Sequence, residues 1–157
     1  MTELLRAKVL TVSDGVANGT REDRSGGAIA ELLEARGFEI VEKRVIPDGS
    51  SSVAAALEAM SAGFVGLLVT TGGTGFGPRD QTPEGTRQVL ERDAPGLAEA
   101  MRLVNPLGRL SRAVAGTKGR ALVLNLPGST GGATECLEAV LDVVPHALDL
   151  LAGGRPH

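Results

Sequence analysis

The segment Leu68–Thr86, LVTTGGTGFGPRDQTPEGT, decides the predicted fold, because an apolar run ends in a glycine-rich loop that leads into a helix. The apolar residues 65–70 are typical of a strand that is buried on both faces, as in parallel sheets. Thr82 is expected to cap the helix, with Pro83 at its first position and Glu84 in its first turn, where the helix dipole favours an acid. The segment therefore predicts a buried strand, a loop with much bare backbone and a helix, in that order.

Strands and helices alternate along the rest of the chain. The patterns predict strands at residues 7–13, 38–46 and 65–70, a loop at 14–24, and helices at 25–36 and around Val53, Leu57 and Met60. Ser25 and the serines of residues 47–52 are expected to cap these two helices. After the glycine loop we expect two short helices, a hairpin with arms at 113–116 and 120–126, and one final helix over 137–151 that Pro145 kinks. This order predicts one domain over residues 1–157, with a largely parallel sheet covered by helices on both faces.

The composition disfavours nucleic acid and membranes as partners. The net charge is −3, Trp and Tyr are absent and only three Phe are present, which argues against binding nucleic acid. No apolar run is long enough to span a bilayer, and the first ten residues, MTELLRAKVL, lack the layout of a signal peptide. The single cysteine, Cys136, excludes an internal disulfide and a cysteine zinc cluster. A cytoplasmic protein is therefore expected.

The carboxyl ends of the predicted strands mark the expected binding site, because ligands of open parallel sheets bind there. The loops that leave these ends carry Ser13 and Asp14, Pro47 and Asp48, the glycine loop of residues 72–80, and residues 125–129. Backbone N–H groups that no side chain obstructs can form a concave nest for phosphate oxygens. The residues expected to serve a polyphosphate in this way are Thr71, Gly72, Gly73, Thr74, Gly75 and Gly77. The alternative is a glycine-rich turn with strained dihedral angles and no ligand.

Two acids of this edge, Asp48 and Asp80, are the best candidates for chemistry. Carboxylates that face phosphates repel them unless a cation intervenes, and Mg²⁺ commonly combines one or two carboxylates with phosphate oxygens and waters. The alternative is that each aspartate caps a turn or a helix, as Asp often does in loops. Asp14 is a third candidate acid. Arg79, Arg109 and Arg112 are candidates to neutralise phosphate, although any one of them is more simply a solvated surface residue.

Several motifs together resemble a known family. They are TVSD at 11–14, EDRSG at 22–26, IPD at 46–48, TTGGTGFGPRDQTPE at 70–84, ERDAPGLAEAM at 91–101, PLGRLSR at 106–112, LNLPGS at 124–129 and VPHALDLL at 144–151. In this order they resemble the molybdopterin adenylyltransferases of molybdenum cofactor synthesis, whose eukaryotic relatives include the amino-terminal domain of gephyrin. The resemblance spans essentially the whole chain.

This resemblance implies a fold, an assembly and a reaction. The fold is a three-layer α/β/α domain, the assembly is a homotrimer, and the reaction is the Mg²⁺-dependent transfer of AMP from ATP to molybdopterin, with release of pyrophosphate. The implied catalytic and metal-binding residues are Asp48 and Asp80. The implied glycine loop is Gly72, Gly73, Thr74 and Gly75, and Ser13, Asp14 and Thr71 at the same sheet edge complete the predicted nucleotide-binding residues. The implied pterin-side loop is Pro127, Gly128 and Ser129, and Asn125 and Arg112 complete the predicted molybdopterin-binding residues.

The chain departs from the family pattern at a few positions. Relatives often carry Arg, Glu and Val where this chain has Gly15, Gly49 and Gln81. Relatives also often carry lysines after LNLPGS, and the absence of lysine here leaves Arg112 and Lys118 as candidate cations for the pterin phosphate. A non-catalytic protein that binds or carries molybdopterin remains the alternative function, although the presence of both acids favours the enzyme. A downstream molybdate-inserting enzyme is a candidate partner.

Overall fold

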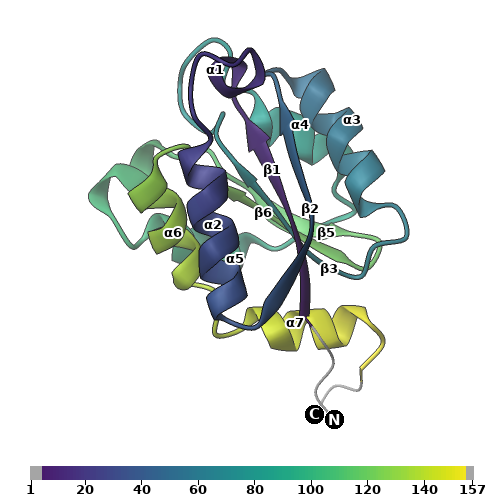
Figure 1. The fold of residues 1–157 in the computed structure, drawn as a ribbon. Coiled ribbons are helices and arrows are strands. Elements are labelled where there is room, and N and C mark those ends of the chain that lie inside the picture. Colours follow the sequence, from purple (N-terminus) through teal and green to yellow (C-terminus); the bar gives the residue numbers. More distant parts are fainter. Residues whose placement is uncertain (1–4, 155–157) are drawn as a thin grey trace.

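The computed structural model describes residues 5–154 as a six-stranded mixed sheet between two layers of helices (Figure 1). The strands are β1 (Leu5–Val12), β2 (Phe38–Ile46), β3 (Gly66–Thr71), β4 (Arg92–Asp93), β5 (Ala115–Lys118) and β6 (Ala121–Leu126). Their order across the sheet is β2-β1-β3-β6-β5-β4. The first four strands in this order are parallel, and β5 runs antiparallel to both of its neighbours. The predicted three-layer fold with a largely parallel sheet is confirmed.

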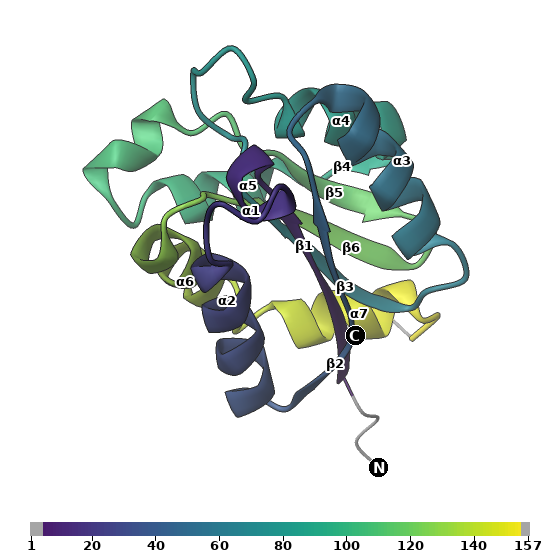
Figure 2. The same cartoon turned by 45° about the horizontal axis from the view of Figure 1, so that its top comes forward.

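The helices divide between the two faces of the sheet. They are α1 (Asp14–Ala17), α2 (Arg24–Ala35), α3 (Ser50–Ser61), α4 (Thr82–Val89), α5 (Pro95–Arg102), the 3₁₀ helix η1 (Pro106–Leu110), α6 (Thr130–Glu138) and α7 (Val144–Leu151). Figure 2 shows α2 and α6 side by side on one face, with α3 and α4 together on the other. None of the helices within residues 5–154 combines the length and the apolar content needed to cross a membrane.

Alternation along the central strands explains how one apolar run serves two cores. Leu67 and Val69 of β3 pack in the cluster that includes α2, α5, α6 and α7, whereas Leu68 packs with α3 and α4. Successive side chains of a strand point to opposite faces, so a strand with helices on both sides must be apolar throughout. By the same alternation, Thr70 and Thr71 at the carboxyl end of β3 face opposite layers.

Two predicted elements and the predicted role of Pro145 are wrong in detail. Residues 14–17, expected as loop, form the short helix α1. The expected single final helix is two helices, α6 and α7, which residues 139–143 separate. Pro145 lies in the first turn of α7, where its missing N–H costs no hydrogen bond, so it starts a helix instead of kinking one. The strand β4 and the 3₁₀ helix η1 were not expected.

The helix caps also differ from the prediction, and the difference matters for the loops. Asp23, not Ser25, caps α2 by accepting a hydrogen bond from the N–H of Gly26. Thr82 lies inside α4, and its hydroxyl donates to the carbonyl of Gly72. No side chain caps α3, and Ser52 donates to the carbonyls of its own entry turn. These hydroxyl groups therefore fix the loops that precede the helices.

Candidate active site

A cavity of about 800 Å³ opens at the carboxyl ends of the parallel strands, as the topology predicts. Its volume lies in the range of sites that bind small molecules. The predicted site residues that line it are Ser13, Asp48, Thr71, Gly72, Gly73, Asp80, Gly128 and Ser129. Those absent from its lining are Asp14, Thr74, Gly75, Arg112, Asn125 and Pro127. The structure thus brings four separate loops to one cavity.

The glycine loop is held in a shape that only glycine tolerates. Gly72 and Gly73 have φ angles of +100° and +70°, and a Cβ atom on Gly72 would collide with the carbonyl of Val12. Within residues 5–154, the backbone N–H groups of Gly73, Thr74 and Gly75 donate no hydrogen bond. Gly73 also lines the cavity. Unbonded N–H groups on bare backbone are what a phosphate nest requires, so the nest stays a prediction at this position.

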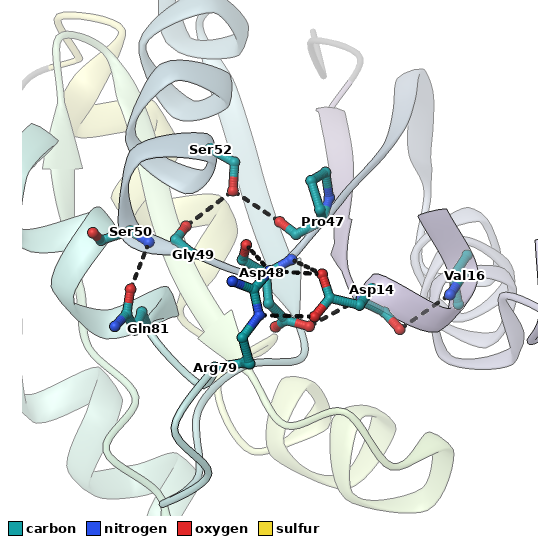
Figure 3. Close-up of polar contacts among 10 residues, drawn as sticks. Asp14, Val16, Pro47, Asp48, Gly49, Ser50, Ser52, Arg79 and Gln81 are labelled. Atoms are coloured by element: carbon teal, nitrogen blue, oxygen red, sulfur yellow. Dashed lines mark hydrogen bonds and ion pairs between the residues drawn. The ribbon is translucent and has the colours of Figure 1, made fainter. Parts of the chain in front are cut away.

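Asp48 is held at the cavity wall by a reciprocal contact with Asp14 (Figure 3). Its Oδ2 accepts a hydrogen bond from the N–H of Asp14 at 3.0 Å, and Oδ1 of Asp14 accepts one from the N–H of Asp48 at 3.1 Å. A Cβ atom placed on Gly73 would lie 3.2 Å from Oδ1 of Asp48, so this oxygen faces the glycine loop. Burial raises the pKa of Asp48, and the negative charges of Asp14 and Asp80 raise it further.

Asp80 makes the turn contacts of a capping residue and also lines the cavity. Its Oδ2 accepts a hydrogen bond from the N–H of Gly77 at 2.9 Å, and its own N–H donates to the carbonyl of Gly77 at 3.0 Å. Asp80 therefore closes a turn within the loop. It also lines the cavity, and its charge acts on Asp48 across that space.

These two carboxylates fit a Mg²⁺ ion that arrives with a nucleotide. Within residues 5–154, no group of three or more His, Cys, Asp or Glu side chains is arranged to hold a metal. Mg²⁺ needs no such group, because it keeps several waters and takes phosphate oxygens as ligands. Burial and the negative charges of Asp14 and Asp80 raise the pKa of Asp48, and a cation bound at its carboxylate would counter both.

Arg112 and Lys118 lie away from the cavity. The guanidinium of Arg112 pairs with Glu84 and donates to the carbonyls of Gly75 and Asp80, so it fastens the glycine loop to α4. Lys118 lies at the end of the sheet away from the cavity, where β5 pairs with the amino-terminal end of β6. Neither residue is therefore brought to the loop that ends in Ser129.

Asn125 is a buried structural residue in this fold. Its side-chain amide donates at 3.0 Å to the hydroxyls of Thr70 and Thr86, and its Oδ1 accepts from the N–H of Val114 at 3.1 Å. It lies on the same strand face as Val123, which packs with α3 and α4. The cavity is walled by α2 and α6, on the other face of the sheet. The side chain of Asn125 thus points away from the cavity.

Residues that the sequence interpretation missed form a second wall of the cavity. They are Thr11, Val12, Val16 and Thr130 and the segment 20–25, which follows α1 and leads into α2. The signal for this wall was the EDRSG motif at 22–26 in a polar loop after the first strand. Asp23 and Ser129 cap α2 and α6, so the N-terminal ends of two neighbouring helices meet at this wall. Such ends favour anions.

Gly15 leaves room at this wall for the side chain of Arg21. The stem of Arg21 lies over Gly15, and a Cβ atom there would come within 2.6 Å of Cδ of Arg21. Among residues 5–154, the guanidinium of Arg21 has no hydrogen-bonding or ion-pair partner. Arg24 also lines the cavity and pairs with Glu22 at 3.4 Å, with both side chains largely exposed. Two guanidinium groups are therefore present where the predicted candidates are not.

Comparison with known proteins gives the same assignment as the motifs. A family model described as "Probable molybdopterin binding domain" matches residues 8–146. The chain is 38% identical over 152 residues to the molybdopterin adenylyltransferase of Helicobacter pylori strain J99, over 92% of this chain and 86% of that one. It is 33% identical over 157 residues to gephyrin of Dictyostelium discoideum, over 91% of this chain and 22% of that longer protein.

A solved structure supports the same conclusion. The molybdopterin biosynthesis enzyme MoaB from Thermus thermophilus superposes with a TM-score of 0.88 and 49% identity, over 97% of this chain and 98% of that one. The family match covers most of the residues, including the loops that meet at the cavity. The resemblance inferred from the motifs is confirmed, and the chain belongs to the family of molybdopterin binding domains.

Proposed function

We propose that this protein acts in molybdenum cofactor biosynthesis and transfers AMP from ATP to the terminal phosphate of molybdopterin. The observation that carries the proposal is that Asp48 and Gly73 line one cavity, with Oδ1 of Asp48 facing Gly73, whose N–H donates no hydrogen bond within residues 5–154. Acids beside a phosphate nest make chemical sense when a metal–nucleotide complex is the ligand. The relative from Helicobacter pylori is named as a molybdopterin adenylyltransferase, which supports the same reaction.

The proposed reaction balances without a protein nucleophile. A phosphate oxygen of molybdopterin attacks the α-phosphorus of ATP, the bond from that phosphorus to the oxygen bridging the β-phosphorus breaks, and pyrophosphate leaves. Mg²⁺, held by Asp48 and Asp80, would neutralise charge on the phosphates. The remaining task of the protein is to position the two substrates and stabilise developing charge, which is how phosphoryl-type transfer is generally catalysed.

The two ends of the cavity suit the two substrates. We assign Gly72, Gly73, Asp48 and Asp80 to the nucleotide and its metal. We assign the wall formed by the capped ends of α2 and α6, with Gly128 and Ser129, to molybdopterin. The ends share a boundary, since a Cβ atom on Gly128 would lie 3.4 Å from Cα of Gly72. A short separation of this kind would bring the two reacting phosphates together.

Arg21 is the cation that we assign to the molybdopterin phosphate. Replacing Arg21 by Gln should weaken molybdopterin binding about tenfold, because a hydrogen bond to a charged group contributes about 1.5–3 kcal/mol. Gly15→Ala should act in the same direction without removing the charge, because its methyl group would displace the stem of Arg21. Calorimetric titration measures both effects.

The matched control for Arg21 is Arg120→Gln, which removes the same charge from the turn between β5 and β6, at the end of the sheet away from the cavity. The control should bind molybdopterin normally. Equal losses for the two variants would show a general charge effect and remove Arg21 from the site.

The proposed function is tested by following pyrophosphate release from ATP with molybdopterin present and absent. Release should require both molybdopterin and Mg²⁺. A protein that binds molybdopterin but releases no pyrophosphate would instead be the non-catalytic binding or carrier protein of the same fold. We place the reaction in the cytoplasm, where ATP is available, with a molybdate-inserting enzyme as the candidate consumer of the product.

We also propose that the protein assembles as a homotrimer, as the family resemblance implies. Exposed apolar side chains gather on and beside η1, where Leu103, Leu107 and Leu110 are 84%, 72% and 53% exposed. Closed cyclic assembly would cover such a surface. Light scattering on the purified protein should give about three chains per particle. A monomer at micromolar concentration would contradict the proposal.

A further inference from the structure

One ion pair joins the three loops that leave β1, β2 and β3. Arg79, from the glycine loop, donates to both carboxylate oxygens of Asp14 at 3.0 Å and to the backbone carbonyl of Asp48 at 3.0 Å. Figure 3 shows the guanidinium of Arg79 beside both the Asp14 carboxylate and the turn that carries Asp48. Asp14 in turn exchanges two hydrogen bonds with Asp48. Within residues 5–154, the hydrogen bonds of Asp48 are therefore all made with Asp14 or Arg79.

The turn around Asp48 is fixed from its other side as well. Ser52 donates to the carbonyls of Pro47 and Gly49, and the N–H of Ser50 donates to the side chain of Gln81 (Figure 3). With these contacts in place, the direction of the Asp48 carboxylate depends on the hydrogen bond from Asp14. That carboxylate faces Gly73.

Stability alone does not account for the Arg79–Asp14 pair. The two side chains are 63% and 42% exposed, and exposed ion pairs contribute little to the free energy of unfolding because water and salt screen them. Direct contact with a substrate phosphate does not account for it either. Arg79 is absent from the cavity lining, and its Nε and Nη2 donors are already used within the loops.

We propose that Arg79 and Asp14 are positioning residues, which hold the Asp48 carboxylate toward Gly73 so that it meets a metal–nucleotide complex there. This inference rests on the proposed function, because it takes a Mg²⁺–nucleoside triphosphate as the ligand of that end of the cavity. Arg79 acts at a distance, through Asp14 and the backbone of Asp48. The bidentate contact matters as much as the charge, because the planar fork of Arg fixes the angle of its carboxylate partner.

The test is a double-mutant cycle between Arg79 and Asp48, read by calorimetric titration with ATP in excess Mg²⁺ and again in EDTA. Arg79→Gln should weaken binding of Mg²⁺–ATP about tenfold, within the range of coupling between neighbouring residues, and change binding of free ATP less than about twofold. In the Asp48→Asn background, Arg79→Gln should cause no further loss. Arg79→Lys, which keeps the charge but not the fork, should lose most of the same affinity.

The control is Arg36→Gln, since Arg36 makes a similarly exposed ion pair, with Glu138, and lies outside the cavity lining. It should leave Mg²⁺–ATP binding unchanged, and thermal melting should show that no variant unfolds below the wild-type temperature. Equal losses for Arg79→Gln with and without Asp48 would mean that Arg79 touches the nucleotide directly, which overturns the inference. Normal binding by Arg79→Gln and Arg79→Lys would overturn it as well.

The same materials separate this inference from the proposed function. If wild-type protein binds Mg²⁺–ATP and the cycle is non-additive, but pyrophosphate is not released when molybdopterin is added, the positioning role stands and the transferase assignment fails. If pyrophosphate is released and the cycle is additive, the transferase assignment stands and the positioning role fails. Wild-type protein that binds no Mg²⁺–ATP would overturn both.

Discussion

Replacing Asp48 by Asn is expected to lower the rate of pyrophosphate release at least about a hundredfold, the usual scale for loss of a group that stabilises transition-state charge. The variant keeps the shape of the side chain and an oxygen that can accept from the N–H of Asp14. It loses the charge that would hold Mg²⁺ at the nucleotide end of the cavity. A steady-state assay with saturating ATP and molybdopterin measures the effect.

The same variant should be slightly more stable than the wild type at neutral pH. The folded state raises the pKa of Asp48 through burial and the charges of Asp14 and Asp80, so ionisation of this carboxyl destabilises the fold. That penalty appears as the pH rises above the unfolded pKa of about 3.9, and it is complete above the folded pKa. Asn carries no such penalty. Its advantage in Tm should therefore be present at pH 7 and vanish as the pH falls below about 3.9.

A surface acid provides the control for Asp48. Asp142→Asn removes an exposed carboxylate in the segment between α6 and α7. It should change neither the rate of pyrophosphate release nor the way in which Tm depends on pH. An active Asp48→Asn enzyme would mean that Asp48 only caps a turn and holds no metal. A destabilised but active variant would point to the same conclusion.

Replacing Asn125 by Leu is expected to have the largest effect on stability. The substitution nearly preserves volume, but it leaves the N–H of Val114 and the hydroxyl of Thr70 without their partner in the interior. Each unsatisfied group costs about 1–3 kcal/mol, so a loss of about 3 kcal/mol is expected, equivalent to a fall in Tm of about 10 °C for a domain of this size. Thermal and urea denaturation measure it.

The control for Asn125 is Asn18→Leu, which alters an exposed amide that bonds to Thr20 within its own turn. Its Tm should shift by less than about 2 °C, as is usual for surface substitutions. Because the resemblance implied a molybdopterin-binding role for Asn125, the two experiments also decide between roles. A folded Asn125→Leu variant with normal Tm and lost molybdopterin affinity would support the binding role.

Much of the fold was predictable because the central strands carry a strong local signal. The strand at residues 38–46 has the predicted bounds and the hairpin is present, although its first arm is Ala115–Lys118 instead of the predicted 113–116. The break between α6 and α7 was not predictable from periodicity. Leu137 and Leu148 contact the same core cluster from separate helices, so the apolar spacing continues through the break. The one sequence feature that indicated a break was Pro145, which has no N–H to donate to the carbonyl one turn earlier.

The site was predictable at the level of loops but not of side chains. The topology rule correctly brought Asp48, Gly73 and Ser129 to one cavity. The rule could not show that the guanidinium of Arg112 already donates to Glu84 and to loop carbonyls, because those contacts join residues that are distant in sequence. Asn125 was wrongly predicted to face the site, although strand alternation places its side chain on the same face as Val123 and not on that of the cavity wall.

The contacts around Arg79 join residues that are far apart in the sequence, and this separation bears on when the site forms during folding. The pairs that it completes, Asp14 with Asp48 and Asp14 with Arg79, are separated by 34 and 65 positions along the chain. Both strand–helix–strand crossovers must close before these groups can meet, and loop closure of that length is entropically unfavourable until the sheet itself repays it. We therefore expect these contacts to form late, so that Arg79→Gln should change the rate at which the native site is lost more than the rate at which the chain folds.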